Sequence, residues 1–126
     1  MMVKGIGVDI IEIDRIEKSI AQLGDSFLHK VFTSGEIAYC SAKTTAAQHY
    51  AARFAAKEAL SKALSTGWAG EVRWKDVEVT NEMSGQPRIE LHGSLKHSLE
   101  RCSVLVSLSH SASHVVAMVV IEELSP

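Results

Sequence analysis

Apolar and polar residues alternate along several short segments of the chain, and such alternation is typical of strands with one buried face. Strands are predicted at residues 3–13, 74–81, 88–91, 103–109 and 114–122. The turn-forming sequence SGQP at 84–87 joins two of these strands, and the loop HSAS at 110–113 joins the last two. Both connections are short enough for antiparallel hairpins.

Helical segments lie between the first strand and the hairpins. The longest predicted helix covers residues 45–64, where alanine is dense, with Ser65 to Gly67 as its stop. A first helix is predicted to begin at Asp14, because Asp14 and Glu17 have the spacing of a capping box. Shorter helices are predicted around Phe27–Phe32, after Thr33 or Ser34 with Glu36 in the first turn, and at 93–101.

Strands and helices occur in blocks, with antiparallel hairpins at the C-terminal end. This order favours an α+β domain over a doubly wound parallel sheet. With 126 residues, the chain is expected to form a single domain, residues 1–126, around one core. The expected architecture is an antiparallel sheet packed against one long helix and several short ones.

The composition limits the class of protein. The net charge of −2 argues against a general nucleic-acid binder. The longest apolar run, Val115–Ile121, is far shorter than the roughly 20 residues that cross a bilayer, and the N-terminus does not resemble a signal peptide. Cys40 and Cys102 form no CxxC pair and are expected to be reduced. We therefore expect a cytoplasmic protein with no membrane or nucleic-acid partner.

The segment RFAAKEALSKAL at 53–64 carries its polar residues on one side of a helical wheel and alanine and leucine on the other. The alanine side would let the helix backbone pack closely on the element beneath it. The polar side fits two interpretations. One is a solvated face with a Glu58–Lys62 pair worth about 0.2–0.5 kcal/mol, and the other is the wall of a binding site. Its members are Arg53, Lys57, Glu58, Ser61 and Lys62.

Asp9 lies inside the apolar sequence GIGVDIIEI. A carboxylate removed from water without a partner is strongly unfavourable, so Asp9 requires a cation, backbone donors or an exposed position at a sheet edge. Gly5 and Gly7 occupy alternate positions before it, and they would leave room for a ligand to approach the carboxylate. A structural acid at a strand end is the alternative interpretation.

Asp9 and Glu58 together would supply two hard oxygen ligands, which suits Mg²⁺ bound to phosphate groups. The basic residues of the 53–64 segment would then complement the phosphates. The sequence SLSHSASH at 107–114 adds hydroxyl groups and His110 as donors to an anion, although a polar hairpin loop explains the same residues. GIG lacks the third glycine of a dinucleotide fingerprint, and no GxxxxGK[ST] sequence occurs.

These segments, in this order, resemble the holo-acyl-carrier-protein synthases, a family of small phosphopantetheinyl transferases. The resemblance spans nearly the whole chain, and the combination of Asp9 with RFAAKEALSKAL is specific to the family. The matching sequences are GIGVDIIEIDRI (5–16), FLHKVFTSGEIAYC (27–40), ARFAAKEALSKALSTG (52–67), KDVEVTNEMSGQPRIELHG (75–93) and SLSHSASHVVAMVVIE (107–122).

The resemblance implies the phosphopantetheinyl transferase fold and a role in fatty acid biosynthesis. Such an enzyme transfers phosphopantetheine from coenzyme A to a serine of apo acyl-carrier protein and releases adenosine 3',5'-bisphosphate. By the same resemblance, Asp9 and Glu58 would hold Mg²⁺, and Lys62 would be a third catalytic residue. Either Glu58 or a metal-associated water would accept the serine proton. The coenzyme A site would include Arg53, Lys57, Ser61, Lys62, Gly85, Pro87, His110 and Ser111.

Family members form homotrimers with the active site between adjacent subunits, so a homotrimer is expected. Relatives often have arginines around Phe27 that hold the acidic carrier protein, but here Asp25 and Ser26 precede it. Carrier binding is therefore expected to depend more on apolar contacts and less on charge. The expected docking residues are Arg15, Lys18, Phe27 and Lys30.

Two other functions would use the same residues. A metal-dependent nucleotide pyrophosphate hydrolase would use the same carboxylates with water as the nucleophile, and it would consume coenzyme A without a carrier protein. A non-catalytic trimeric binding domain would have a structural Asp9 and a solvated helix face.

Overall fold

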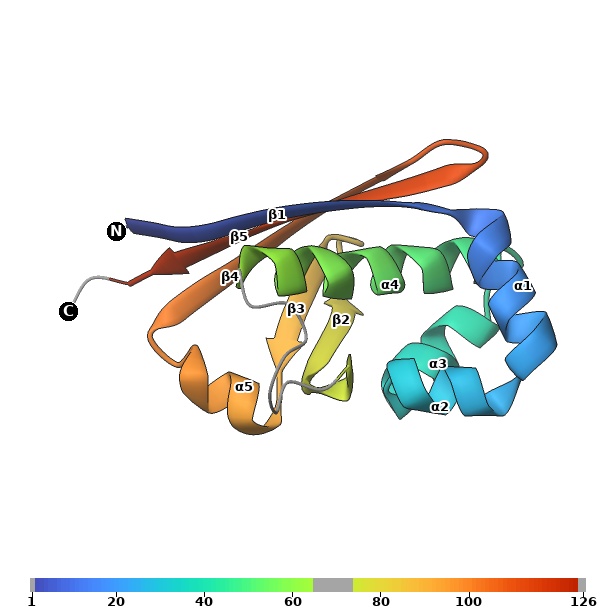
Figure 1. Cartoon of the computed structure of the whole chain (residues 1–126), viewed down its shortest axis with the longest axis horizontal. Coiled ribbons are helices and arrows are strands. Elements are labelled where there is room, and N and C mark those ends of the chain that lie inside the picture. The colour runs from blue at the N-terminus through green and yellow to red at the C-terminus, as the bar shows by residue number, and fades with distance from the viewer. Residues whose placement is uncertain (1, 65–73, 125–126) are drawn as a thin grey trace.

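An antiparallel sheet with one long helix along one face forms the centre of the molecule (Figure 1). The structure, a computed structural model, describes residues 2–64 and 74–124. The sheet has the order β1–β5–β4, and a separate antiparallel pair lies beside it. The predicted α+β class is confirmed. The strands are β1 (Met2–Glu12), β2 (Val77–Asn81), β3 (Pro87–Leu91), β4 (Cys102–His110) and β5 (His114–Glu123).

Helix α4 runs along the sheet, and the shorter helices lie around it. Figure 1 shows α1, α2 and α3 together at one end of α4, with α5 on the side of α4 away from β1 and the β2–β3 pair beside α4, where β3 contacts β4. Residues Trp74–Asp76 form a 3₁₀ turn before β2 rather than the start of a strand. The helices are α1 (Ile13–Leu23), α2 (Asp25–Val31), α3 (Ser34–Ser41), α4 (Ala46–Ala63) and α5 (Gly93–Ser98).

The helix starts agree with the sequence in one case and differ in another. Thr33 caps α3 as predicted: its hydroxyl accepts from the Glu36 N–H at 3.2 Å, and its N–H donates to Glu36 Oε1 at 2.9 Å. The capping box predicted for Asp14 is wrong, because Glu12 takes the N-cap position without a side-chain bond. Strand β1 continues directly into α1 at Ile13. The Ile13 N–H donates to the Ser113 carbonyl at 2.9 Å. The predicted stop at 65–67 lies outside the described residues.

Strand β1 packs directly on the backbone of α4. A Cβ atom added to Gly7 would overlap the Ala59 carbonyl oxygen and lie 2.7 Å from the Ala63 nitrogen, and one added to Gly5 would overlap the Ala63 carbonyl oxygen. Ala59 and Ala63 are buried, which confirms the close packing predicted for the alanine side of the helix. The space expected beside Asp9 for a ligand is instead filled by helix backbone, so that part of the interpretation is wrong.

The face of the sheet that points away from α4 is apolar and exposed. On β1, Ile6, Val8 and Ile10 are 56–63% exposed, and they pair with Val120, Met118 and Val116 of β5. Leu105 of β4 continues the same face and is also exposed. Within the described part of the chain, no helix covers these side chains (Figure 1). An apolar patch of this kind marks an interaction surface.

Replacing Gly7 with alanine tests the close contact between β1 and α4. The added methyl group has no room against the Ala59 carbonyl, so we expect the free energy of unfolding to fall by at least about 2 kcal/mol. Urea denaturation followed by circular dichroism measures this loss. Lys4→Ala, an exposed change on the same strand, is the control and should change stability by less than about 0.5 kcal/mol. Equal midpoints for the two variants would contradict the packing.

Candidate active site

Asp9 and Lys62 form an ion pair between β1 and the last turn of α4. The Lys62 ammonium donates to Asp9 Oδ1 at 3.0 Å and to the Val8 carbonyl at 3.1 Å. Asp9 points to the α4 side of the sheet, and its side chain is 15% exposed, whereas that of Lys62 is 55% exposed. The cation that Asp9 required is therefore Lys62, and the pair is open to solvent from the lysine side.

Glu58 lies on the turn of α4 that is level with Asp9. Gly5 touches Ala63 and Gly7 touches Ala59, so β1 and α4 run in opposite directions. Two strand residues advance about 6.6 Å, the rise of about 4.4 helical residues. Continuing from Gly7 to Asp9 therefore reaches the helical turn that contains Glu58. The register of β1 against α4 therefore places the backbone of Glu58 at about the level of Asp9.

Three of the polar residues on α4 are buried rather than solvated. Arg53, Lys57 and Ser61 are 3%, 0% and 4% exposed, respectively. The solvated-face interpretation of this segment is therefore wrong for these positions. Because α4 packs on the sheet on one side and on α1, α3 and β2 on others, most of its residues are buried.

Lys57 is the centre of a buried hydrogen-bond network. Its ammonium donates to Glu36 Oε1 and to the Val31 carbonyl, both at 2.7 Å, and to the Trp74 carbonyl at 3.1 Å. Burial lowers the pKa of Lys57 below its ordinary value, although the Glu36 carboxylate opposes this effect. All three donors are satisfied within the chain, so the structure does not place Lys57 on an open coenzyme A surface.

Glu36 completes this network. From the sequence, Glu36 was predicted only as a residue in the first turn of α3. Its other oxygen, Oε2, accepts from the Val79 N–H at 2.8 Å, and the side chain is fully buried. One carboxylate thus connects the start of α3, the middle of α4 and strand β2. The sequence shows the capping spacing of Glu36 but gives no sign of the contacts to residues 21 and 43 positions away.

Arg53 connects α4 to the turn of the β2–β3 hairpin. Its Nη2 donates to Asn81 Oδ1 at 2.7 Å, and the Asn81 amide donates to the Gly85 carbonyl at 3.0 Å. The guanidinium also lies 4.3 Å from the centre of the Tyr39 ring. Among the described residues, Arg53 Nε is a buried donor without a partner. Arg53 and Gly85, both predicted for the coenzyme A site, are therefore coupled through Asn81.

The hairpin turn borders a cavity beside β4. Gly85 has a φ of 92°, which favours glycine, and its N–H donates to the Glu82 carbonyl at 2.8 Å. Pro87 begins β3 and lines a cavity of about 570 Å³ whose other wall is β4, around Leu105. Pro87 thus shapes one edge of an open groove, and Gly85 lies in the turn just before it.

His110 and Ser111 lie at the β4–β5 turn, away from the Asp9–Lys62 pair. Both are exposed, and the Ser111 hydroxyl accepts from the N–H groups of Ser113 and His114 at 3.2 and 3.1 Å. The turn lines a cavity of about 410 Å³ together with Ile10. In this single chain, Asp9 and Lys62 contact each other and Val8, and the structure does not bring His110 or Ser111 to them.

The residues expected to dock the carrier protein lie on α1 and α2. Arg15, Lys18 and Lys30 are exposed, as docking cations must be. Phe27 is half-buried and packs edge-to-face on Phe32, with 6.0 Å between the ring centres. Its exposed part, rather than the whole ring, is left for a partner.

This arrangement of strand, helix and hairpin matches a known family. Residues 5–119 match the model of the 4'-phosphopantetheinyl transferase superfamily, and the chain belongs to that family. A holo-[acyl-carrier-protein] synthase of Solibacter usitatus is 45% identical over 124 residues, which are 96% of this chain and 99% of that protein. The predicted family and enzyme class, a phosphopantetheinyl transferase, are confirmed.

Solved structures agree with the fold over the whole chain. The holo-[acyl-carrier-protein] synthase from Neisseria meningitidis has a TM-score of 0.90 and 31% identity, and the match covers 97% of this chain and 100% of that one. A holo-(acyl-carrier-protein) synthase from Bacillus anthracis, in complex with CoA (3',5'-ADP), has a TM-score of 0.82 and 38% identity, covering 99% and 100% of the two chains. The predicted phosphopantetheinyl transferase fold is confirmed.

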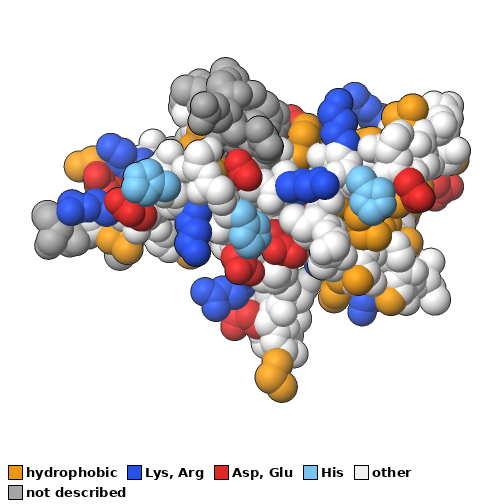
Figure 2. Space-filling model, turned by 90° about the horizontal axis from the view of Figure 1, so that it is seen from below, with side chains coloured by type: hydrophobic (Ala, Val, Ile, Leu, Met, Phe, Trp, Pro, Cys, Tyr) orange, Lys and Arg blue, Asp and Glu red, His pale blue; other side chains and the backbone are white. Residues whose placement is uncertain are grey.

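Charged side chains of both signs are mixed on the surface of the molecule. Figure 2 shows acidic, basic and histidine side chains interspersed over one face of the molecule, without a large area of one sign. None of the helices that the structure describes is long and apolar enough to span a membrane.

Two lysines five positions apart should respond differently to the same substitution. Lys57→Met would leave the Glu36 carboxylate buried without its counter-charge, and we expect a loss of about 3–5 kcal/mol in the free energy of unfolding. Lys62→Met removes a cation that is 55% exposed and leaves the Asp9 carboxylate at the solvent-facing edge of the sheet, so it should change stability by less than about 1 kcal/mol.

Chemical denaturation of both variants measures the difference. Adding Glu36→Gln to Lys57→Met should recover part of the loss, because the unpaired charge is removed. A Lys57→Met variant as stable as Lys62→Met would contradict the buried network.

Proposed function

We propose that the chain catalyses Mg²⁺-dependent transfer of phosphopantetheine from coenzyme A to a serine of apo acyl-carrier protein. The products are holo-carrier protein and adenosine 3',5'-bisphosphate. Similarity to proteins named holo-[acyl-carrier-protein] synthase supports the reaction, and the Bacillus anthracis relative bound to CoA (3',5'-ADP) supports the substrate. The observation that carries the proposal is the Asp9–Lys62 contact beside the helical turn of Glu58.

Asp9 and Glu58 are the proposed ligands of Mg²⁺. Both offer the hard oxygen donors that Mg²⁺ prefers. Within the described ranges 2–64 and 74–124, Asp9 at the edge of the sheet has one cation, Lys62, as its side-chain partner. When bound, Mg²⁺ would neutralise charge on the pyrophosphate of coenzyme A as the phosphorus–oxygen bond breaks. The donor set therefore fits the ion that the family chemistry requires.

Lys62 is the proposed phosphate-binding cation. Its ammonium is exposed and is held by one carboxylate and one carbonyl, so it can turn to a phosphate oxygen when Asp9 gains another partner. The proton of the attacking serine would pass to Glu58 or to a water beside it. Lys57 has no part in this proposal, because its three donors are used inside the protein.

The remaining coenzyme A contacts are proposed to come from two surfaces. Pro87 borders the groove beside β4, and Arg53 holds the preceding turn, which contains Gly85, in place through Asn81. His110 and Ser111 offer exposed side chains at the β4–β5 turn, and Ser61 is buried on α4. Because His110 and Ser111 are separated from Asp9 within one chain, a site shared between two copies would bring them to it.

The exposed sheet face supports the proposed homotrimer. Ile6, Val8 and Ile10, with their partners on β5, form an apolar surface on an otherwise mixed-charge molecule. Burying such a surface between copies is favourable by roughly 25 cal/mol per Å² of apolar area. Contact through this face would place β1 of one copy near another copy, which agrees with active sites between subunits.

The partner and location complete the proposal. Arg15, Lys18 and Lys30 are available for the acidic carrier protein, with Phe27 as an apolar contact. The cysteines Cys40 and Cys102 are unpaired, which suits a cytoplasmic enzyme. Burial raises the pKa of the Cys40 thiol to about 11, so Cys40 remains an unreactive core residue.

Mass spectrometry of the carrier protein tests the reaction. Incubation of the protein with coenzyme A, Mg²⁺ and apo acyl-carrier protein should add one phosphopantetheine group to the carrier. Asp9→Ala and Glu58→Ala should each lower kcat/KM by at least about 100-fold, whereas Lys18→Ala should mainly raise the KM for the carrier. Coenzyme A consumed without a carrier adduct would instead indicate a pyrophosphate hydrolase. Transfer that survives loss of Asp9 would refute the metal assignment.

Sedimentation velocity tests the trimer. Val8→Asp places a charge in the centre of the exposed sheet face, and the particle mass should fall about threefold because a carboxylate is unfavourable in an apolar interface. Lys96→Glu on α5 adds negative charge at an exposed position elsewhere and should leave the trimer intact. Wild-type protein that sediments as a monomer at micromolar concentration would contradict the proposed trimer.

A further inference from the structure

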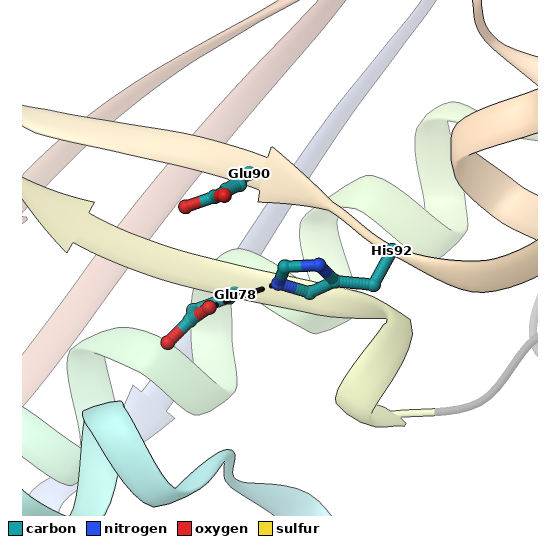
Figure 3. Close-up of side chains that lie close together, drawn as sticks. All are labelled: Glu78, Glu90 and His92. Atoms are coloured by element: carbon teal, nitrogen blue, oxygen red, sulfur yellow. Dashed lines mark hydrogen bonds and ion pairs between the residues drawn. The ribbon is translucent and has the colours of Figure 1, made fainter.

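Three potential metal ligands converge on one face of the β2–β3 hairpin, away from the proposed active site. Glu78 of β2 is directly opposite Glu90 of β3, and His92 follows two residues after Glu90 on the same face. Figure 3 shows Glu78 and His92 joined by a hydrogen bond, with the Glu90 side chain beside them on the neighbouring strand. One ligand atom from each residue lies within 4.8 Å of the other two.

This arrangement leaves negative charge without a complete partner. Like charges directly opposite each other on paired strands destabilise a hairpin. His92 Nε2 lies 2.9 Å from Glu78 Oε1, so the Glu78 carboxylate has His92 as a hydrogen-bond partner. Among the residues that the structure describes, no hydrogen bond or ion pair involves the Glu90 carboxylate. A cation placed between the three side chains would offset the repulsion.

We propose that Glu78, Glu90 and His92 form a binding site for a divalent transition-metal ion, with Zn²⁺ as the best fit. Two carboxylate oxygens and one imidazole nitrogen are a donor set that Zn²⁺ accepts, and three protein ligands leave a fourth position for water. Mg²⁺ prefers oxygen donors alone, so the histidine selects against it. The site shares no residue with the proposed Mg²⁺ ligands Asp9 and Glu58.

The protein already holds two of the three ligands in position. The Thr33 hydroxyl donates to Glu78 Oε2 at 2.8 Å, which leaves Oε1 directed toward His92. The backbone N–H of His92 donates to the Asp76 carbonyl at 2.8 Å. Outer hydrogen bonds of this kind orient the ligands of metal sites. The side chains of Glu78 and His92 are 17% and 41% exposed, so an ion can enter from solvent.

The state of Glu78 is consistent with this role. Burial by itself raises the pKa of its carboxyl group, but the hydrogen bonds from His92 and Thr33 outweigh this and hold it below the ordinary value.

Because Thr33 caps α3, an ion at this site would connect the hairpin to the start of that helix. The turn of the same hairpin carries Gly85.

The metal-site proposal does not depend on the proposed function, since it concerns metal binding and stability alone.

Metal titration of the tag-free, chelator-treated protein tests the proposal. Calorimetry with Zn²⁺ and visible absorption with Co²⁺ are measured with Mg²⁺ in excess, which occupies oxygen-only sites. We expect one ion per chain, with a rise in Tm. Glu90→Gln and His92→Gln should each weaken Zn²⁺ binding by at least about tenfold. His97→Gln, which changes another exposed histidine near a glutamate, is the matched control and should bind as the wild type does.

Glu90→Gln also separates metal binding from a structural role. Without metal it should be at least as stable as the wild type, because the repulsion with Glu78 is removed, yet Zn²⁺ should no longer raise its Tm. Zn²⁺ that binds all variants equally would place the ion elsewhere and overturn the proposal. Failure of the folded wild type to bind Zn²⁺ or Co²⁺ would also overturn it, leaving a Glu78–His92 ion pair alone.

Discussion

The contact between β1 and α4 is the constraint on which the other features depend. Two glycines on the strand and two alanines on the helix allow the backbones to meet, and no larger side chain fits at Gly5 or Gly7. This contact fixes the level of Asp9 along α4 and brings it within reach of Lys62. The packing of small residues therefore has a chemical result, because it sets where a carboxylate meets a cation.

The same helix separates charges used for folding from charges available for chemistry. Lys57 is enclosed and bonded to Glu36, so it joins α3, α4 and β2 into one rigid unit. Lys62, about one and a half turns later, remains exposed and is held by exchangeable contacts. The buried lysine would thereby stabilise the scaffold that positions the exposed one, and a substrate would compete for only one of them.

Much of the fold could be predicted from local patterns, whereas much of the site could not. The antiparallel hairpins, the long helix and the Thr33 cap follow from alternation, alanine content and turn residues, which act over a few positions. The burial of Arg53 and Lys57 depends on Asn81 and Glu36, partners 28 and 21 positions away, so a helical wheel shows the charges but not their environment. Gly5 and Gly7 were correctly singled out as a close approach, but the group that approaches is a helix and not a ligand.

The apolar outer face of the sheet has a consequence for how the protein responds to dilution and to mutation. A chain that covers this face with copies of itself is stabilised by mass action, so its folding equilibrium depends on how much of it the cell makes. In the proposed assembly, symmetry would repeat every substitution at the exposed Ile6, Val8 or Ile10 at each subunit contact, which would multiply a small local defect. Strand β1 would thus be the segment least tolerant of sequence drift, since both of its faces are committed.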